Sequence, residues 1–487
     1  MEVELQPYEW VSGDRDGGFS IRVYGHLRDQ PGRPAERVLL RIEDYQPFCR
    51  LELPSFLHGK PCTWSVEALQ AYAKWLRGCL RDHQPTKIVY KELQKIYGYR
   101  NQQKYPFLVC SFLTEEAMRH CVNLLNKQAY QIEQLGLIKA RVWETSITTV
   151  HRLVTDLNLG YSQWLRTKVT PVLELDKISH CQHEYIASYQ DIHPLSQEET
   201  QSWTVSPMTC AIDIECYSHN HLTMPNRDYV KDKVTMISYI TERIGPMGGE
   251  QKKYLLVVGP CEDIPGVSVR RFGHEITMLD GLSDVINETD PTLMITYNGA
   301  GFDFPYLEAR MKLYMREWKP CGLLKDQPTT IKTNSWKSSA YGFMNISTLE
   351  AEGRLNIDMY PIIKRDTKLD RYTLDFVSNH FLGQGKNDVT PKQMFEIHAR
   401  AMKAEESGDQ EKINEASKET AKVGAYCVQD SYLCIALLKK LNTWIGLTET
   451  SNIVSITPTA VWTRGQQVRV QNQVYRYAYR EGFVMDE

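Results

Sequence analysis

The fold is decided by the stretch Cys210-Ala-Ile-Asp213-Ile-Glu215, which ends an apolar run that begins at Met208. Alternate side chains of an extended strand share a face, so Asp213 and Glu215 project together while Ile212 and Ile214 point into a sheet. Two neighbouring carboxylates repel each other unless cations lie between them, and Mg²⁺ or Mn²⁺ prefers such oxygen ligands. Taken alone, the triplet is better explained as an exposed strand edge.

A second motif lies downstream, Ile295-Thr-Tyr-Asn298-Gly-Ala-Gly-Phe302-Asp303-Phe304. An apolar strand, Thr292–Tyr297, is expected to end in a glycine-containing turn that lets the backbone approach a ligand closely. We expect a helix to begin near Asp303. As a lone feature Asp303 is better explained as a helix cap, and Phe302 is either a core residue or an aromatic surface for a terminal base.

The third motif is Tyr426-Cys-Val-Gln-Asp430, inside a helix of about six turns expected from near Thr420 to Leu441. Tyr426 and Asp430 are one turn apart and therefore share a face. A carboxylate and a phenol in this arrangement could bind a metal and orient a water molecule. The alternative for Tyr426 is ordinary packing with its hydroxyl exposed. An apolar stripe at helical spacing supports the helix; its members are Val423, Cys427, Cys434, Leu438 and Leu441.

The order of the three motifs carries more weight than any one of them. A strand with D-x-E comes first, then a strand–turn–helix with N-x-x-x-F-D, then a helix with Y-x-x-x-D. Together they supply the side chains of a two-metal phosphodiesterase, in which one ion generates and positions hydroxide and the other stabilises the leaving 3′ oxygen. The sequence therefore predicts that folding gathers these acids around two divalent ions, Mg²⁺ or Mn²⁺.

This order resembles the Exo I, Exo II and Exo III motifs of family B DNA polymerases. The resemblance implies a ribonuclease-H-like, mixed-sheet α/β (α+β) exonuclease domain, preceded by a mixed α/β N-terminal domain. It implies that Tyr426 holds the attacking water, and that Asn298 and Phe302 contact the 3′-terminal nucleotides of DNA. The implied metal ligands, which with Tyr426 form the catalytic set, are Asp213, Glu215, Asp303 and Asp430.

Other segments resemble the delta-type enzymes and their relatives in large DNA viruses. The quoted segments are Val38-Leu-Leu-Arg-Ile-Glu-Asp44, Ser338-Ser-Ala-Tyr-Gly342, Gly353-Arg-Leu-Asn-Ile-Asp358, Tyr372–Ser378, Phe381–Asp388 and Thr463–Gln467 through Glu481–Val484. The last of these is similar to the segment that leads into the palm. The palm motifs D-x-x-S-L-Y-P-S and Y-G-D-T-D-S are missing, as is the fingers motif, so we expect no polymerisation by this chain alone. Truncation, a split gene or an interrupted frame would each explain that.

We expect three units: residues 1–200 as the N-terminal domain, 201–450 as the exonuclease domain, and 451–487 as the start of the segment leading into the absent palm. Polar Gln190–Ser202 separates the first two. Within the first unit, strands are expected at Phe19–Tyr24, Arg37–Ile42 and Phe48–Leu53, and helices near Ser65–His83 and Thr114–Lys127. Further strands are expected at Met208–Ile214, Val234–Ile240 and Tyr254–Val258, with a helix at Glu275–Ile286.

Two segments have open interpretations. Lys87–Pro106 is basic and rich in tyrosine, a mixture that could stack single-stranded nucleic acid, although an exposed hairpin with half-buried tyrosines is the better explanation. Residues 402–420 are highly charged and are expected to form a solvated helix or a lid.

The overall composition excludes several classes of protein. With 57 Lys+Arg against 60 Asp+Glu the formal charge is −3, which argues against indiscriminate coating of nucleic acid but not against DNA held in a groove. The 12 cysteines form no C-x-x-C pair, so neither a zinc ribbon nor a disulfide framework is indicated. Without an apolar leader or a long apolar run, we expect a soluble, intracellular protein without membrane attachment.

The leading hypothesis is the N-terminal and proofreading part of a replicative DNA-directed DNA polymerase that binds DNA and nucleotides. The expected partners are a primer 3′ end or single strand, the C-terminal polymerase half and a processivity factor, and the expected location is the nucleus or a viral replication site. The alternatives are a self-sufficient 3′→5′ exonuclease, or a non-catalytic DNA-binding or assembly module that keeps the exonuclease fold.

Overall fold

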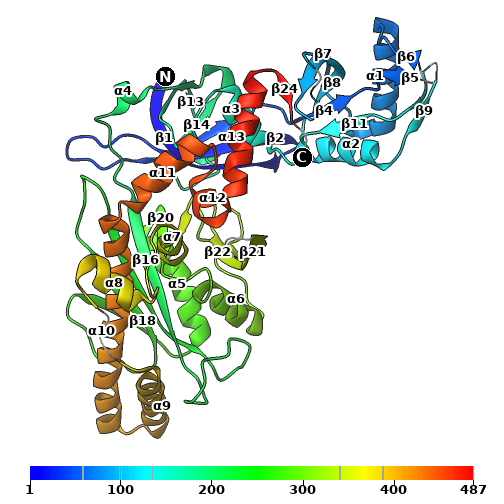
Figure 1. Cartoon of the computed structure of the whole chain (residues 1–487). Helices are drawn as coiled ribbons and strands as arrows, with labels where there is room; N and C mark the ends of the chain where they lie inside the picture. The colour runs from blue at the N-terminus through cyan, green and yellow to red at the C-terminus, as the bar shows by residue number, and fades with distance from the viewer. Residues whose placement is uncertain are drawn as a thin grey trace.

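The computed structural model describes residues 1–57, 60–97, 99, 101–133, 135–338, 342–385 and 389–485. It is a mixed α/β structure whose three large sheets occupy separate parts of the molecule (Figure 1). Among these residues, no helix combines the length and the apolar character needed to cross a membrane.

The sheet that carries the first two motifs has six strands, in the order β19-β18-β17-β16-β20-β23. The strands β16, β17 and β18 pair antiparallel, whereas β18/β19, β16/β20 and β20/β23 pair parallel. The bounds are β16 Met208–Cys216, β17 Val234–Arg243, β18 Lys252–Val258, β19 Val267–Phe272, β20 Leu293–Thr296 and β23 Leu355–Asp358. This mixed sheet confirms the expected fold class of the exonuclease unit.

Helices cover both faces of this sheet, and the strands are therefore almost continuously apolar. Ile212 and Ile214 pack with α5 (Glu275–Thr289) and α6 (Asp303–Leu313), while Ala211 packs on the opposite face against α10 (Gln410–Lys440). Asp213 and Glu215 alternate with Ile212 and Ile214 along β16, so they project on the α10 face. The site thus lies between the sheet and one long helix.

The N-terminal 200 residues contribute two sheets rather than one. A seven-stranded sheet has the order β13-β14-β3-β2-β1-β12-β15, and α3 (Thr149–Asp156) contacts it. Its strands are β1 Glu2–Arg15, β2 Gly18–His26, β3 Arg37–Ile42, β12 Leu165–Lys168, β13 Thr170–Pro171, β14 His183–Ala187 and β15 His193–Pro194. A short helix, α4 (Gln197–Thr200), begins the connection to the exonuclease sheet.

The second N-terminal sheet has five strands in the order β11-β4-β8-β7-β24 and forms a separate lobe with its own core (Figure 1). Ser65 caps the first of its two helices, accepting a hydrogen bond from the Ala68 amide as its position predicts. The strands of this sheet are β4 Phe48–Glu52, β7 Lys87–Lys95, β8 Tyr105–Ser111, β11 Arg141–Trp143 and β24 Phe483–Val484, and the helices are α1 Val66–Leu80 and α2 Glu115–Lys127. Two short strand pairs accompany them. One consists of β5 Phe56–Leu57 and β6 Lys60–Pro61, and the other of β9 Tyr130–Ile132 and β10 Gly136–Ile138.

The tyrosine-rich segment forms the β7–β8 hairpin of this lobe. Tyr97 and Tyr99 are exposed, and Tyr105 lies under the ammonium of Lys95. The hairpin was the better of the two interpretations of the sequence, and stacking of nucleic acid on it stays a prediction.

The last part of the chain is helical and returns to the N-terminal sheets (Figure 1). Its elements are α7 Met359–Asp366, α8 Leu374–Leu382, α9 Pro391–Ser407, α10, α11 Thr443–Val454, α12 Pro458–Thr463 and α13 Gln466–Arg480. The strand β24 then pairs parallel with β7. A two-stranded hairpin, β21 (Thr330–Ser338) with β22 (Gly342–Glu350), lies beside the exonuclease sheet.

One helix differs from the sequence expectation in where it begins. The helix that carries Tyr426 and Asp430 begins at Gln410, about ten residues earlier than expected, and is 31 residues long. The charged segment 402–420 therefore spans the end of α9, the turn at 408–409 and the start of α10, and the two helices pack through small residues such as Ala401, Ala404 and Ala416. Such small contacts produce no stripe of large apolar residues for a sequence to display.

Candidate active site

The first two acids lie side by side on β16, as the strand period predicts. Oxygen atoms of Asp213 and Glu215 and the sulfur of Cys427 all lie within 4.8 Å of one another. Both side chains are half-buried on the face of the sheet that α10 covers. Strand and helix, far apart in the chain, thus contribute to one cluster.

Helix α10 is held against the strand next to these acids. Asp213 is paired with Ser238 in the β16–β17 register, and the hydroxyl of Ser238 lies 2.6 Å from that of Ser431. Asp430 precedes Ser431 and is 2% exposed. Tyr426, one turn earlier, is half-buried. The helix thereby brings Asp430 to the side of the sheet on which Asp213 projects.

Asp303 begins helix α6 and reaches back to β16. Its Oδ1 accepts a hydrogen bond of 3.2 Å from the backbone amide of Ile214, the residue between Asp213 and Glu215. No side-chain cap is recorded for this helix, so the carboxylate bridges two elements instead of capping one. The side chain is 5% exposed.

The turn that precedes Asp303 is organised by an acid that the motifs did not include, Asp358. Its carboxylate accepts hydrogen bonds from the amides of Asn298 at 2.7 Å and Ala300 at 2.9 Å. Asn298 has a left-handed backbone with φ of 64°. A Cβ at Gly299 would lie 2.5 Å from the side chain of Thr296, so the turn needs a glycine there.

Burial makes the ionised forms of these acids costly. Burial, followed by the charge of Asp358, raises the pKa of Asp303 to about 7. Burial likewise raises the pKa of Asp358 to about 6, although three backbone amides oppose that rise. Acids with raised pKa values in one cluster are the electrostatic condition that a bound divalent cation relieves.

The two cysteines of α10 report how close the acids are. Burial, then the charges of Asp213, Asp430, Asp303 and Asp358, raises the pKa of the Cys434 thiol well above its ordinary value. Burial and the neighbouring carboxylates also raise the pKa of Cys427. At both positions the shift favours the thiol over the thiolate, which is the form that binds metal ions.

The donor set fits hard divalent ions. Carboxylate oxygens are the ligands that Mg²⁺ and Mn²⁺ prefer, and Asp213 and Glu215 bring two carboxylates together in this cluster. Among the described residues, only the Asp213–Glu215–Cys427 group meets the 4.8 Å spacing, so Asp303 and Asp430 lie somewhat farther from this pair.

A shallow cavity of about 310 Å³ lies beside the site, between Phe302 and the loop that contains Arg227. Phe302 is 36% exposed, and its ring lies 5.6 Å from that of Tyr306. Both Arg227 and Asp228 are exposed. The cavity thus joins an aromatic surface to a loop with an exposed guanidinium.

This loop is held in place by a buried arginine. Arg310 on α6 is fully buried, forms an ion pair with Glu275 at 2.8 Å, and donates to the carbonyl oxygens of Arg227, Tyr229 and Val230. Because α6 begins at Asp303, one helix positions both an acid of the site and the loop facing Phe302. Sequence reasoning missed Arg310 and Asp358, since neither belongs to a motif.

Two quoted segments fall partly outside the described residues. These are Ser339 to Tyr341 of the segment after the second motif, and Lys386 to Asp388 of the segment before α9.

Comparisons with known proteins agree with this geometry. Residues 140–377 match the family described as DNA polymerase family B, exonuclease domain. The DNA polymerase 120R of Invertebrate iridescent virus 3 is 30% identical over 507 aligned positions, which cover 99% of this chain and 43% of that protein. The DNA polymerase delta catalytic subunit of Oryza sativa subsp. japonica is 25% identical, over 96% of this chain and 40% of that subunit.

A solved structure shares the fold. The family B DNA polymerase of the hyperthermophilic archaeon Pyrobaculum calidifontis aligns with a TM-score of 0.63 at 18% identity, over 99% of this chain and 51% of that one. The chain therefore spans about half or less of the length of the relatives it matches.

Proposed function

Since this chain belongs, through its exonuclease domain, to the family B DNA polymerases, we propose that it removes nucleotides from the 3′ end of DNA by metal-assisted hydrolysis. The observation that carries the proposal is the hydrogen bond from the Ile214 amide to Asp303. It ties the acid of the second motif to the strand segment between Asp213 and Glu215. Domain boundaries near residues 200 and 450 are part of the proposal.

In this proposal each acid has a role set by its place. Asp213, Glu215, Asp303 and Asp430 hold two divalent ions, which would activate water and stabilise the leaving 3′ oxygen. Tyr426, one turn from Asp430, orients the attacking water through its hydroxyl. Asp358 shapes the turn before Asp303 and touches no reacting atom, so it is a positioning residue.

Phe302 and Asn298 would contact the last nucleotides of the strand. The half-exposed ring of Phe302 offers a face on which a base can stack. Across the cavity, Arg227 would neutralise a phosphate of the same strand. Arg310 keeps the loop of Arg227 at a fixed distance from that ring.

The wider context is also a proposal. The relatives are named as DNA polymerases, so we infer that this unit proofreads for a polymerase half that contains the palm motifs missing from this sequence. A processivity factor and a site of action in the nucleus or a viral replication site follow from that inference.

The direct test uses a single-stranded oligonucleotide labelled at its 5′ end, incubated with the purified chain and Mg²⁺. We expect a ladder of products shortened one nucleotide at a time, whereas a 5′→3′ enzyme would release the label as a mononucleotide. The double variant Asp213→Ala, Glu215→Ala should give no ladder. Equal activity of the two proteins, with or without an added palm-containing fragment, contradicts the proposal.

A further inference from the structure

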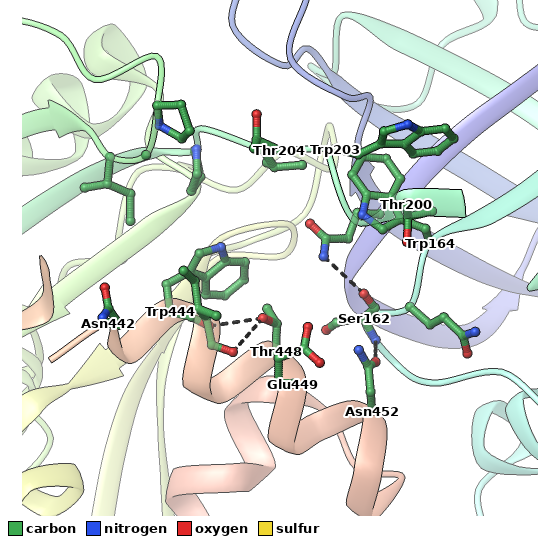
Figure 2. Close-up of a pocket in the computed structure, with 18 of the residues that line it drawn as sticks. Ser162, Trp164, Thr200, Trp203, Thr204, Asn442, Trp444, Thr448, Glu449 and Asn452 are labelled. Atoms are coloured by element: carbon green, nitrogen blue, oxygen red, sulfur yellow. Dashed lines mark hydrogen bonds between the residues drawn. The ribbon is translucent and has the colours of Figure 1, made fainter. Parts of the chain in front are cut away.

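A cavity of about 680 Å³ lies away from the acidic site. It opens between the N-terminal sheet, the segment that follows α4, the end of β17 and the corner between α10 and α11 (Figure 2). Pro207, just before β16, lines it, and Asp213 lies six residues along the strand, which is about 20 Å. A ligand in this cavity would therefore not contact the acids of the exonuclease site.

Three tryptophans form its walls. Trp164 and Trp203 meet edge to face with ring centroids 5.1 Å apart, and Trp444 comes from the first turn of α11 (Figure 2). Trp164 and Trp444 are 7% and 8% exposed. Indole rings offer large flat surfaces on which planar heterocycles stack.

Another part of the lining, formed by Gln6, Ser162 and Asn452, is held together by hydrogen bonds. Asn452 accepts a hydrogen bond of 2.8 Å from the Ser162 amide, and the side-chain amide of Gln6 donates to the Ser162 carbonyl. Any Cβ at Gly160 would lie 2.6 Å from the Asn452 side chain, so glycine permits this close approach. These contacts join α11 to the N-terminal sheet and fix the cavity independently of any ligand.

The two charged side chains that line the cavity, Lys439 and Glu449, differ in whether they are already paired. The ammonium of Lys439 is bound to Glu242 at 2.6 Å. Glu449 also lines the cavity and makes no hydrogen bond or ion pair with any residue that the structure describes. The side chains of Gln197, Gln201 and Asn442 likewise make no hydrogen bond with any residue that the structure describes, and they offer further donors and acceptors to a ligand.

We propose that this cavity binds a guanine nucleoside, with the base stacked on the tryptophans and its N1–H and N2–H donating to Glu449. Guanine alone among the common bases presents two adjacent N–H donors on its Watson–Crick edge, the pattern that a carboxylate accepts in bidentate fashion. The volume suits a ligand of nucleoside size. Lys439 is the one cation that lines the cavity within the part of the chain that the structure describes, and it is already paired with Glu242, so a phosphate would remain outside, at the mouth.

The same chemistry reaches the cavity from two sources, a free nucleoside or an unpaired guanine of a single strand. A basic side chain from another protein could also use indole rings and a carboxylate. A purine with its ribose fills more of the 680 Å³ than one such side chain does, so the observations favour the nucleoside.

The test is calorimetric titration of the full chain with guanosine, adenosine and N-acetyl-arginine amide, in EDTA so that the exonuclease site holds no divalent ion. We expect guanosine to bind about tenfold or more tightly than adenosine, the discrimination typical of a bidentate contact. Quenching of tryptophan fluorescence should follow the same curve. No guanosine binding, equal binding of adenosine, or tighter binding of the arginine amide overturns the proposal.

Variants make the test specific. Glu449→Gln should remove the preference for guanosine, whereas Glu415→Gln, on the exposed start of α10, should leave it unchanged. Trp203→Ala should weaken both nucleosides, because it removes a stacking surface. An unchanged preference in Glu449→Gln contradicts the assigned contact.

Two further arms separate the sources and the sites. If an unpaired guanine of a single strand is the source, a pentanucleotide with one central guanine should bind more tightly than guanosine, and Glu449→Gln should remove that advantage. If the free nucleoside is the source, the pentanucleotide should show no such loss. Guanosine binding should survive Asp213→Ala. Loss of binding in that variant contradicts a separate cavity, while failure of the exonuclease assay alone leaves this result intact.

Discussion

The hydroxyl of Ser238 on β17 lies 2.6 Å from the hydroxyl of Ser431 on α10, in the buried seam beside the acidic site. Ser238 is paired with Asp213 across the β16–β17 ladder, and Ser431 follows Asp430 in the helix. This contact therefore fastens α10 beside the strand that carries Asp213, next to Asp430.

The seam predicts a non-additive mutational pattern. Ser238→Ala and Ser431→Ala should each cost about 1–3 kcal/mol, because each leaves a buried hydroxyl without its partner. The double variant should cost less than the sum of the two. Denaturant unfolding of all four proteins measures this, and strictly additive losses contradict a direct contact.

The acids and the phenol should differ in their effect on rate. Asp213→Ala or Asp430→Ala should lower single-turnover cleavage by about a thousandfold or more, because each removes a metal ligand. Tyr426→Phe should cost only about ten- to a hundredfold, because it removes an orienting hydroxyl. Similar losses in all three variants would argue against these roles, and exposed Asp370→Ala serves as the neutral control.

The junction between the N-terminal and exonuclease units should be sensitive to pH. Burial, followed by the charge of Glu352, raises the pKa of Glu9 from 4.5 to about 8, and Glu9 accepts a hydrogen bond of 2.6 Å from the Gly353 amide. Between those values the unfolded state releases a proton that the folded state retains. The contribution to stability is thus fully present below pH 4.5 and is lost as the pH rises through about 8.

The matched variant for that prediction is Glu9→Gln, which keeps an acceptor for Gly353 and cannot ionise. Its free energy of unfolding should fall less between pH 5 and pH 8 than that of the parent. Parallel pH profiles of the two proteins would show that Glu9 is not responsible.

The buried arginine should separate stability from binding. Arg310→Met should cost about 3–5 kcal/mol, because it leaves Glu275 buried without its cation. Adding Glu275→Gln should restore part of this stability, since the amide still accepts from Val234. The double variant should nevertheless bind single-stranded DNA more weakly than the parent, because the carbonyls of the Arg227 loop have lost their donor. Full recovery of both properties contradicts the positioning role.

The turn before Asp303 should depend on Asp358. Asp358→Ala leaves the amides of Asn298 and Ala300 without an acceptor, at a cost of about 2–4 kcal/mol. The variant should lower kcat more than it raises KM, because it displaces the catalytic acid rather than the surface that binds the DNA strand. Asp358→Asn, which can still accept one of these bonds, should lie between the two proteins.

Local patterns predicted the core of the exonuclease unit. Apolar runs gave β16, β17 and β20 to within a few residues, and the turn glycines placed the start of α6 at Asp303. These elements succeed because their burial on both faces writes a continuous signal into the sequence. The strand β1 was missed, because the polar–apolar alternation that starts at Glu2 is short and breaks at the irregularity between Pro7 and Glu9.

The roles of Asp358 and Arg310 could not be predicted in the same way. Asp358 meets the turn because β23 pairs parallel with β20, which sets it beside Thr296. Arg310 meets its loop because α6 packs beside the segment that precedes β17, where Tyr306 also donates to the carbonyl oxygen of Asp232. Both contacts depend on topology, and a single sequence carries no local mark that distinguishes one buried aspartate or arginine from an exposed one.

The pairing of β24 with β7 imposes an order of assembly on a chain synthesised from its N-terminus. Val484 is fully buried with Phe107 and Trp143, so this edge of the five-stranded sheet stays uncovered until residue 484 has left the ribosome. The strands and helix that bear the acids of the proposed site emerge earlier. A nascent chain would therefore already contain the acidic cluster of Asp213 and Glu215 while still presenting an open strand edge to neighbouring molecules, a hazard for aggregation.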